Sequence, residues 1–177
     1  YNNFALEVSV QTEIPSEKLN EISSLNSAKQ LVAFTSGGTF VVTSGSQTEA
    51  VTSENIYSYQ QGRVGAKPVQ AIKLGDFLYF VQRAGEKLIE FKFSWEEDGY
   101  LSETISMLNE DVLVSGIKEM TVQETEDNVL WCVLEDGRIA TLTRIPSQNV
   151  SALSPQETDG EYVSVASIPV DGQFWDD

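Results

Sequence analysis

The sequence predicts an all-β domain, because one hairpin pattern recurs three times along the chain. In each copy a short apolar run turns near a glycine and returns as a second apolar run. The three hairpins occupy residues 30–43, 77–93 and 129–143. Their equivalent residues Leu31, Leu78 and Leu130 are 47 and 52 residues apart. A sheet unit that recurs every ~40–50 residues is typical of a β-propeller blade. We therefore expect an incomplete β-propeller-like array of about three antiparallel blades, plus the leading strand of a fourth.

A further apolar run precedes each hairpin and adds a third strand to the unit. These runs cover residues 19–25, 69–74 and 117–122. A fourth run, 162–168, has no hairpin after it. Val, Ile, Phe, Tyr and Thr are enriched in the runs, which favours strands over helices. The unit is predicted to be strand, turn, strand, glycine turn and strand. The expected blades are, approximately, 19–43, 69–93, 117–144 and a partial blade at 162–177.

Glycine and aspartate at the hairpin turns are predicted to have structural roles. Gly37 and Gly38 end the first hairpin strand, and Asp136 and Gly137 do the same in the third hairpin. Glycine adopts positive φ at low cost, and aspartate bonds to its own backbone in turns. The paired glycines are not followed by the Lys-Ser/Thr of a phosphate-binding loop or by a helix pattern. We therefore interpret all four residues as structural turn residues.

The connections between the repeats have their own expected structures. Residues 44–55 are rich in Ser, Thr and Gly and lead to 56–59, which alternates apolar and polar side chains as an extra or outer strand does. The acidic stretch 95–100 is expected to form a turn. Residues 102–113 are the best candidate for a short helix, and the polar stretch 146–160 is expected to be an exposed loop.

Length and pattern together predict one domain over residues 1–177. A chain of 177 residues can bury a substantial core. No apolar run approaches the ~20 residues that a membrane helix requires, so we expect no membrane insertion. The first residue is Tyr1 rather than a methionine, and the sequence stops within the repeat. We expect it to be a fragment of a longer chain.

The composition argues against catalysis and against a metal or organic cofactor. The chain has no histidine, which is the commonest general base and a frequent metal ligand. Its single cysteine, Cys132, excludes an internal disulfide and a thiolate zinc cluster. Twenty-seven acidic and 11 basic residues give a net charge of −16, so we expect no specific binding of nucleic acid. We predict no catalytic, cofactor-binding or metal-binding residues, although paired carboxylates remain open as an alternative.

Most aromatic residues fall within the predicted strands, where core packing is the favoured interpretation. Trp95 and Trp175 lie beyond strand ends, and Tyr100 closes the acidic turn. Large amphipathic rings at such positions are common in contacts with other chains. Trp95, Tyr100 and Trp175 are therefore our candidate interface residues.

The order of several short motifs resembles the tail nozzle, or tail-tubular, structural proteins of short-tailed bacteriophages and prophages. The first such motif is the run 31–40, which contains Thr35-Ser36-Gly37-Gly38. The motifs that follow are Gln61-Gly62, Pro68-Val69, Phe80-Val81-Gln82-Arg83, Asp98-Gly99-Tyr100, Leu130-Trp131-Cys132-Val133, Asp136-Gly137, Asp159-Gly160-Glu161, Val163-Ser164-Val165 and Ile168-Pro169. The resemblance extends over about residues 20–170.

This resemblance implies a virion structural protein without enzymatic activity. Members of the family carry a β-propeller-like domain and form an oligomeric ring around the channel through which DNA leaves. The implied partners are other copies of the chain and neighbouring tail proteins, with DNA passing through without specific binding. The implied location is the virion tail, after synthesis in the bacterial host cytoplasm. The alternative is a propeller-type ligand-binding module or a carbohydrate-active enzyme, which would require a pocket with convergent carboxylates and aromatics.

Overall fold

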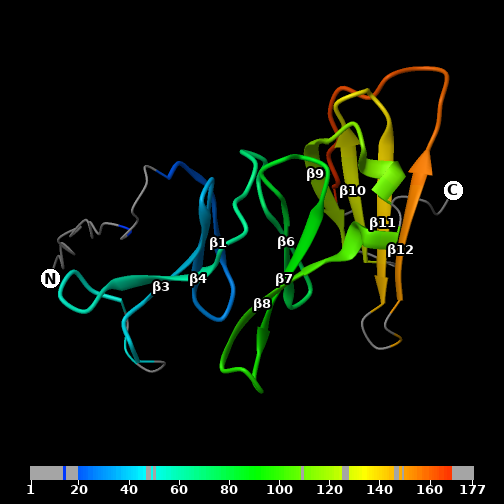
Figure 1. Cartoon of the computed structure of the whole chain (residues 1–177). Coiled ribbons are helices and arrows are strands. Elements are labelled where there is room, and N and C mark those ends of the chain that lie inside the picture. The colour runs from blue at the N-terminus through cyan, green and yellow to red at the C-terminus, as the bar shows by residue number, and fades with distance from the viewer. Residues whose placement is uncertain are drawn as a thin grey trace, which may run out of the picture.

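The chain forms three antiparallel four-stranded sheets that follow one another in the sequence. The computed structural model describes residues 14, 20–46, 49, 51–108, 110–124, 128–145, 148 and 150–168. In Figure 1 the sheets stand in a row, with the N-terminal sheet at the left and the C-terminal sheet at the right. The strands of this described part form no closed barrel. The prediction of an all-β chain is confirmed.

Each sheet is a meander, because every strand pairs with the next strand along the chain. Sheet 1 contains β1 (Ile22–Ser27), β2 (Leu31–Thr35), β3 (Gly38–Thr43) and β4 (Tyr57–Gly62). Sheet 2 contains β5 (Ile72–Leu74), β6 (Phe77–Val81), β7 (Leu88–Ser94) and β8 (Gly99–Thr104). Sheet 3 contains β9 (Ile117–Gln123), β10 (Val129–Leu134), β11 (Ile139–Ile145) and β12 (Val150–Gln156). Two 3-10 turns, η1 (Ile105–Leu108) and η2 (Glu110–Leu113), connect sheets 2 and 3.

Each sheet has a fourth strand that the three-strand unit did not include. β4 agrees with the outer strand expected near 56–59, but the loop expected at 146–160 was wrong in part, because β12 occupies residues 150–156. The helix expected at 102–113 was wrong in part, since residues 102–104 belong to β8 and only 3-10 turns follow. β12 is exposed at all positions but Leu153, and β8 is polar and at most half-buried after Leu101, so these two strands lack the apolar pattern that marks the hairpins. The sheets therefore extend beyond the predicted blades.

The strand expected at 162–168 is absent from the structure. These residues have no regular secondary structure, and six of the seven side chains are exposed. The segment lies against sheet 3, where the Lys118 ammonium donates to the carbonyl of Val163 and the Ser164 hydroxyl donates to Glu119. An apolar alternating run forms a strand only when a neighbouring strand satisfies its backbone groups. The remainder of the partial blade expected at 162–177 lies outside the described residues.

The middle sheet is buried on both faces, and this explains the continuous apolar sequence of β6. Leu78 and Phe80 pack toward sheet 1, and Tyr79 and Val81 pack toward sheet 3. All four residues are at most 1% exposed. Successive side chains of a strand point to opposite faces, so a strand with two buried faces needs apolar residues at every position. Sheet 2 is therefore the centre of the stack.

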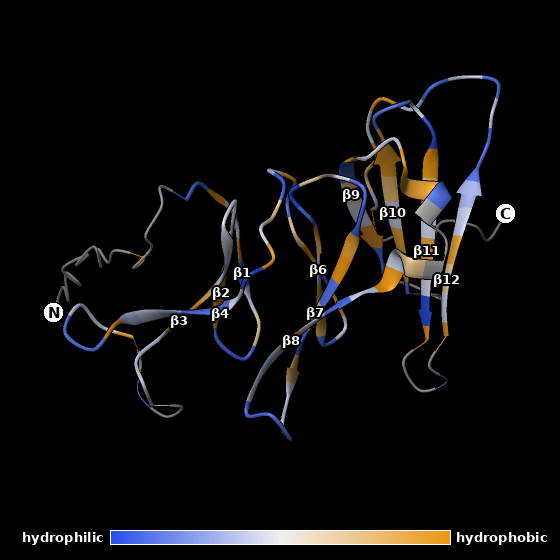
Figure 2. Ribbon diagram, in the orientation of Figure 1, coloured by the Kyte–Doolittle hydropathy of each residue, from blue (hydrophilic) through white to orange (hydrophobic). Residues whose placement is uncertain are grey.

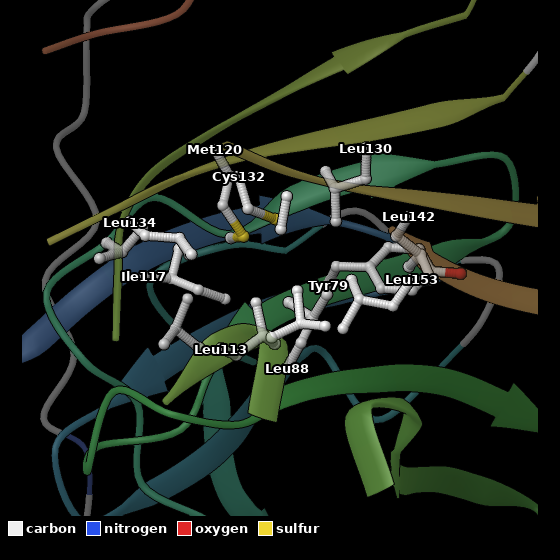
Figure 3. Close-up of a cluster of buried hydrophobic side chains, with 14 of the residues drawn as sticks. Tyr79, Leu88, Leu113, Ile117, Met120, Leu130, Cys132, Leu134, Leu142 and Leu153 are labelled. Atoms are coloured by element: carbon white, nitrogen blue, oxygen red, sulfur yellow. The ribbon is translucent and has the colours of Figure 1, made fainter. Parts of the chain in front are cut away.

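Two apolar cores hold the stack together, one on each side of sheet 2. The first joins Val32, Phe34 and Val41 of sheet 1 to the aromatic face of sheet 2. The second joins sheet 2 to sheet 3, and Figure 3 shows Tyr79 and Leu88 facing Leu130, Cys132 and Met120 across it. Figure 2 shows β10 in orange, the colour of apolar residues, whereas much of β12 is pale blue or white. Leu113 of η2 closes the second core and is fully buried.

A repeated set of backbone hydrogen bonds ties each hairpin to the segment that leads into its own sheet. In every sheet the residue five positions after the aligned leucine donates its N–H to a carbonyl of that segment. The three bonds are Ser36 to Glu21 (3.0 Å), Arg83 to Gly65 (2.8 Å) and Glu135 to Gly116 (2.9 Å). The recurrence shows that the sequence repeat is also a repeat of tertiary contacts.

A second set of backbone bonds ties each hairpin to the segment that comes after its sheet. The N–H groups of Ala66 and Ile117 donate to the carbonyls of Thr35 (2.7 Å) and Gly85 (2.9 Å) in the preceding hairpins. Tyr162 continues this series after sheet 3, because its N–H donates to the carbonyl of Gly137 at 2.7 Å. Residue 162 therefore occupies the position from which a following sheet begins in the two earlier repeats, although residues 162–168 form no strand.

Replacing Gly65 by alanine is expected to destabilise the junction between sheets 1 and 2. A Cβ at Gly65 would collide with the backbone carbonyl of Ser36, which no side-chain movement can relieve. We expect Gly65→Ala to lower the free energy of unfolding by about 1–3 kcal/mol, measured by urea denaturation. Gly160→Ala is the matched control, since nothing lies within 4 Å of its Cβ position and a change below about 0.5 kcal/mol is expected. Equal losses in the two variants would contradict the prediction.

Candidate functional site at the rim of the first two sheets

The exposed indole of Trp95 marks a rim where sheets 1 and 2 meet. Trp95 follows β7 in the turn before β8, and 76% of it is exposed. Asp98 adopts a positive φ of 45° in this turn, and the N–H of Glu97 donates to the Ser94 hydroxyl at 3.4 Å. Lys29, from the β1–β2 connection of sheet 1, places its ammonium 3.9 Å from the ring centres of both Phe93 and Trp95. A cation over two rings fixes the two sheets relative to each other at this rim.

A continuous series of aromatic contacts connects Trp95 to the core. Phe93 meets Trp95 edge-on at 5.1 Å and Tyr100 at 5.2 Å between ring centres. Tyr100 in turn stacks on Phe91 at 4.8 Å with the ring planes nearly parallel. Edge-on and stacked pairs of this kind add to the energy of simple burial. The orientation of the exposed indole is thus set by side chains that are themselves packed.

Tyr100 lies inside this rim rather than on its outer surface. Only 5% of the residue is exposed, and its hydroxyl accepts a hydrogen bond of 3.2 Å from the backbone N–H of Gln30. Burial raises the pKa of the Tyr100 phenol, so the hydroxyl is neutral and stays available for this bond. Of the three candidate interface residues, Trp95 is exposed, Tyr100 joins sheets 1 and 2, and Trp175 lies outside the described residues.

The rim contains a hollow of about 530 Å³ with a basic and aromatic lining. Trp95, Phe93 and Phe77 contribute rings, and three lysines also line it: Lys29, Lys73 and Lys92. A smaller hollow of about 130 Å³ lies on the other side of Lys29, between Tyr57, Tyr59 and Asp98. The larger volume falls in the range of small-molecule sites. In a chain of net charge −16, a hollow lined by three lysines is a local exception.

The four predicted turn residues lie at hairpin turns, away from this rim. The Thr35 hydroxyl accepts from the N–H groups of Gly37 and Gly38 and donates to the Gly38 carbonyl. Gly137 has a φ of 81°, and Asp136 accepts from the backbone N–H of Arg138 and forms an ion pair with its guanidinium at 2.8 Å. The structure therefore assigns these residues local hydrogen-bonding roles.

A buried charged cluster between sheets 2 and 3 was not anticipated from the sequence. Glu90 of β7 is 0% exposed, and its carboxylate accepts from Arg144 of β11 at 2.9 Å and 3.3 Å. The Tyr79 hydroxyl donates to the same carboxylate at 2.8 Å, and Lys92 lies 3.5 Å from it. The one available signal was a glutamate within the apolar run 88–93, at a position where a strand with two buried faces would carry an apolar side chain.

The charged and polar groups of the cluster are paired with one another. Burial by itself would raise the pKa of Glu90, but hydrogen bonds from Arg144 and Tyr79 hold it below the ordinary value. Burial, together with the hydrogen bond to Glu90, raises the pKa of Tyr79 far above its usual range. An anionic Glu90 therefore holds a neutral Tyr79 and a charged Arg144. None of these groups is poised to exchange a proton near neutral pH.

The other chemistry-bearing features of the described residues are a buried cysteine and a second groove. No cluster of three or more His, Cys, Asp or Glu side chains that could hold a metal ion occurs among the described residues. Burial raises the pKa of Cys132 to about 12, so its thiol is protonated and inert. A groove of about 660 Å³ lies between the outer face of sheet 3 and residues 162–168, lined by Trp131, Thr121 and Gln123 among others. That groove has no ionisable carboxylate in its lining.

Replacing Glu90 by glutamine is expected to be strongly destabilising, because Arg144 would remain buried without an anionic partner. We expect Glu90→Gln to lower the free energy of unfolding by about 3 kcal/mol, measured by urea denaturation at neutral pH. The control Glu103→Gln removes an exposed carboxylate that pairs with Lys92 at 3.0 Å, and a change within about 0.5 kcal/mol is expected.

A double variant, Glu90→Gln with Arg144→Met, tests whether the two groups act as a pair. Its destabilisation should be smaller than the sum of the single losses, because Arg144→Met removes the charge that Glu90→Gln leaves unpaired. If the loss of unfolding free energy in the double variant equals the sum of the losses in the two single variants, the interaction between Glu90 and Arg144 does not stabilise the fold.

The low pKa of Glu90 also predicts how stability depends on pH. The pKa of Glu90 is lower in the folded protein than in the unfolded chain. The stabilisation that anionic Glu90 gives to the fold is therefore present above the unfolded pKa and is lost as the pH falls through the folded pKa. The difference in unfolding free energy between wild type and Glu90→Gln should therefore shrink as pH is lowered from about 7 to about 3. A difference that stays constant over this range would contradict the role assigned to Glu90.

Comparison with known proteins adds no family to this description. A scan against protein-family models matches no family, and a search of curated proteins finds no match. Within the described residues, no helix has the length and apolar character needed to cross a membrane. Inference about function therefore depends on the residues and geometry of the chain itself.

Proposed function

We propose that this chain is a non-catalytic structural segment of a bacteriophage tail nozzle. In this proposal the three sheets are three blades of a propeller-like domain that continues beyond the described residues. Further copies of the chain assemble with it into a ring around the DNA exit channel, next to other tail proteins. The chain would act in the virion tail, after synthesis in the host cytoplasm, and would bind no cofactor.

The observation that carries the proposal is the repeated tertiary contact between successive sheets. Each hairpin is bonded to the segment that leads into its own sheet and to the segment that follows it. The bond from Tyr162 to Gly137 repeats this contact after the third sheet. A repeat in which each unit contacts its neighbours through the same bonds is an extensible architecture, as expected for blades or arrays. Such an array supplies a scaffold rather than an active site.

The motifs that resemble nozzle proteins support the specific role, because they fall at structural positions of the repeat. Thr35 and Gly38 form the first hairpin turn, and Gly137 forms part of the third. The Asp98-Gly99-Tyr100 motif contains the last residue of the turn before β8 and the tyrosine that joins sheets 1 and 2. Residues 130–133 lie in β10, at the centre of the second core. Similar motifs in the same order are consistent with a shared arrangement of sheets.

The acidic charge supports a channel-lining role as a corollary. The chain carries a net charge of −16, and exposed acids such as Glu96, Glu97 and Glu157 lie in its turns and connections. Affinity for DNA comes largely from cationic side chains that neutralise phosphates. Carboxylates on the wall of a channel would therefore let DNA pass without adhering.

A ligand-binding module is the second candidate function, and the hollow at the rim favours it. Its volume of about 530 Å³ and its mixture of lysines and aromatic rings suit a small polar ligand. Carbohydrate hydrolysis is less well supported. It requires two carboxyls that flank a substrate bond, and the lining of this hollow contains one acid, Asp76.

Electron microscopy and native mass spectrometry of the full-length protein test the proposed function. We expect closed rings of identical subunits, with the sheet stack identifiable in each subunit and acids facing the lumen. Rings with a basic lumen would contradict the charge corollary alone. A protein that stays monomeric at high concentration and in the presence of neighbouring tail proteins would overturn the nozzle proposal. Turnover of a glycan substrate would favour the enzymatic alternative.

A further inference from the structure

We propose that the hollow at the rim of sheets 1 and 2 binds a short acidic saccharide, with Trp95 as the stacking platform and Lys73 and Lys29 as the cations. This inference does not depend on the nozzle role, since any protein with this rim would present the same site. The hollow holds about 530 Å³, which suits one to a few sugar rings rather than a long polymer.

The charge of the lining points to an anionic ligand. Three of the 11 basic residues of the chain line this one hollow, although the net charge is −16. Lys92 is already held by two carboxylates, at 3.5 Å from Glu90 and 3.0 Å from Glu103. Among the described residues, no carboxylate lies within ion-pair distance of Lys29 or Lys73. The ammonium groups of Lys29 and Lys73 are thus available to bind an anionic ligand.

The position of Lys73 directs its charge to the side of sheet 2 that faces sheet 1. Lys73 pairs with Leu78 across the β5–β6 ladder, and directly opposed residues of an antiparallel pair share a face. Leu78 belongs to the core between sheets 1 and 2. Asp76, in the adjoining turn, is the one exposed acid in the lining, so cations exceed acids there even when Lys92 is counted as neutralised.

The aromatic lining points to a sugar rather than to a bare anion. Trp95 is 76% exposed, and Phe93 supports it edge-on at 5.1 Å. An exposed indole fixed by packing offers a flat apolar surface, on which the C–H face of a sugar ring can stack at little entropic cost. The Lys29 ammonium lies over the same indole, 3.9 Å from the ring centre, so a positive charge sits directly beside the surface that a sugar would contact. A ligand with one apolar face and one acidic group matches both features.

The surroundings of the hollow select a short ligand over a nucleic acid. Glu96, Glu97 and Asp98 follow Trp95 directly and are exposed. A long polyanion in the hollow would have to run past these carboxylates and along a surface of strongly negative net charge. A saccharide of two or three rings needs only the lysines and the indole, so it meets fewer carboxylates than a long polyanion does. We therefore assign the hollow to an acidic oligosaccharide.

Titration of the full chain with α-1,4-trigalacturonate tests the proposal directly. The neutral α-1,4-galactotriose is the matched probe, because it replaces each carboxylate by a hydroxymethyl group. We expect saturable binding of the acidic sugar by calorimetry at low salt, with a shift of the Trp95 indole N–H signal in NMR spectra. The neutral sugar should bind roughly tenfold or more weakly. Absence of saturable binding of the acidic sugar at millimolar concentration, or equal affinity for both sugars, would overturn the proposal.

Two variants and one control locate the binding. Lys73→Gln and Trp95→Ala should each weaken binding of trigalacturonate by roughly tenfold or more. Arg83→Gln removes an exposed positive charge in the β6–β7 connection and should leave the affinity unchanged. Equal losses in Lys73→Gln and Arg83→Gln would mean general charge attraction and would overturn the site. Trp95→Ala with intact sugar affinity but an altered oligomeric state, measured by sedimentation, would assign Trp95 to a protein interface instead.

Discussion

The structure depends on a middle sheet that has no solvent-facing side. Sheet 2 is covered by sheet 1 on one face and by sheet 3 on the other, so each side chain of β6 from Leu78 to Val81 is buried. This double burial joins the three meanders into one body, because sheet 2 removes both of its apolar faces from water only by packing against its neighbours. It also dictates that any polar group on sheet 2 must be paired within the protein. Glu90 is that case, and its partner Arg144 comes from the next sheet.

At the rim of sheet 2 the side chains are no longer covered by the neighbouring sheets, so groups there can contact a ligand or another chain. Toward this rim β7 continues into Lys92, Phe93 and Trp95, and the cover of the neighbouring sheets gives way to solvent. The aromatic rings keep contact with the core, so the rim is rigid, while the lysines at its edge remain accessible. A rigid scaffold with polar and aromatic groups at its margin is a common way for β-sheet proteins to form binding surfaces. The ligand-binding role proposed for this chain uses that margin.

The hairpins were predictable and the outer strands β8 and β12 were not, for one physical reason. β2, β6 and β10 are at least half buried, so their apolar runs are long and recur at a regular spacing. β8 and β12 border the sheets, where polar residues and even Pro155 are tolerated. Their sequences resemble loops because nothing requires an apolar alternation at an edge. Trp95 could be identified as exposed from its place after a strand, whereas the lysines around it come from three separate segments.

By itself the sequence determined the class of fold, the repeat and the hairpin turns, because strand alternation and turn chemistry are local properties. It also determined a net charge of −16 and the absence of histidine chemistry. Only the tertiary structure decided that Glu90 meets Arg144, 54 residues away, and that Lys29 lies over Phe93 and Trp95. It also decided that residues 162–168 form no strand, because an edge strand needs a partner to complete its backbone hydrogen bonds. Contacts between distant segments depend on how sheets stack, which no local pattern records.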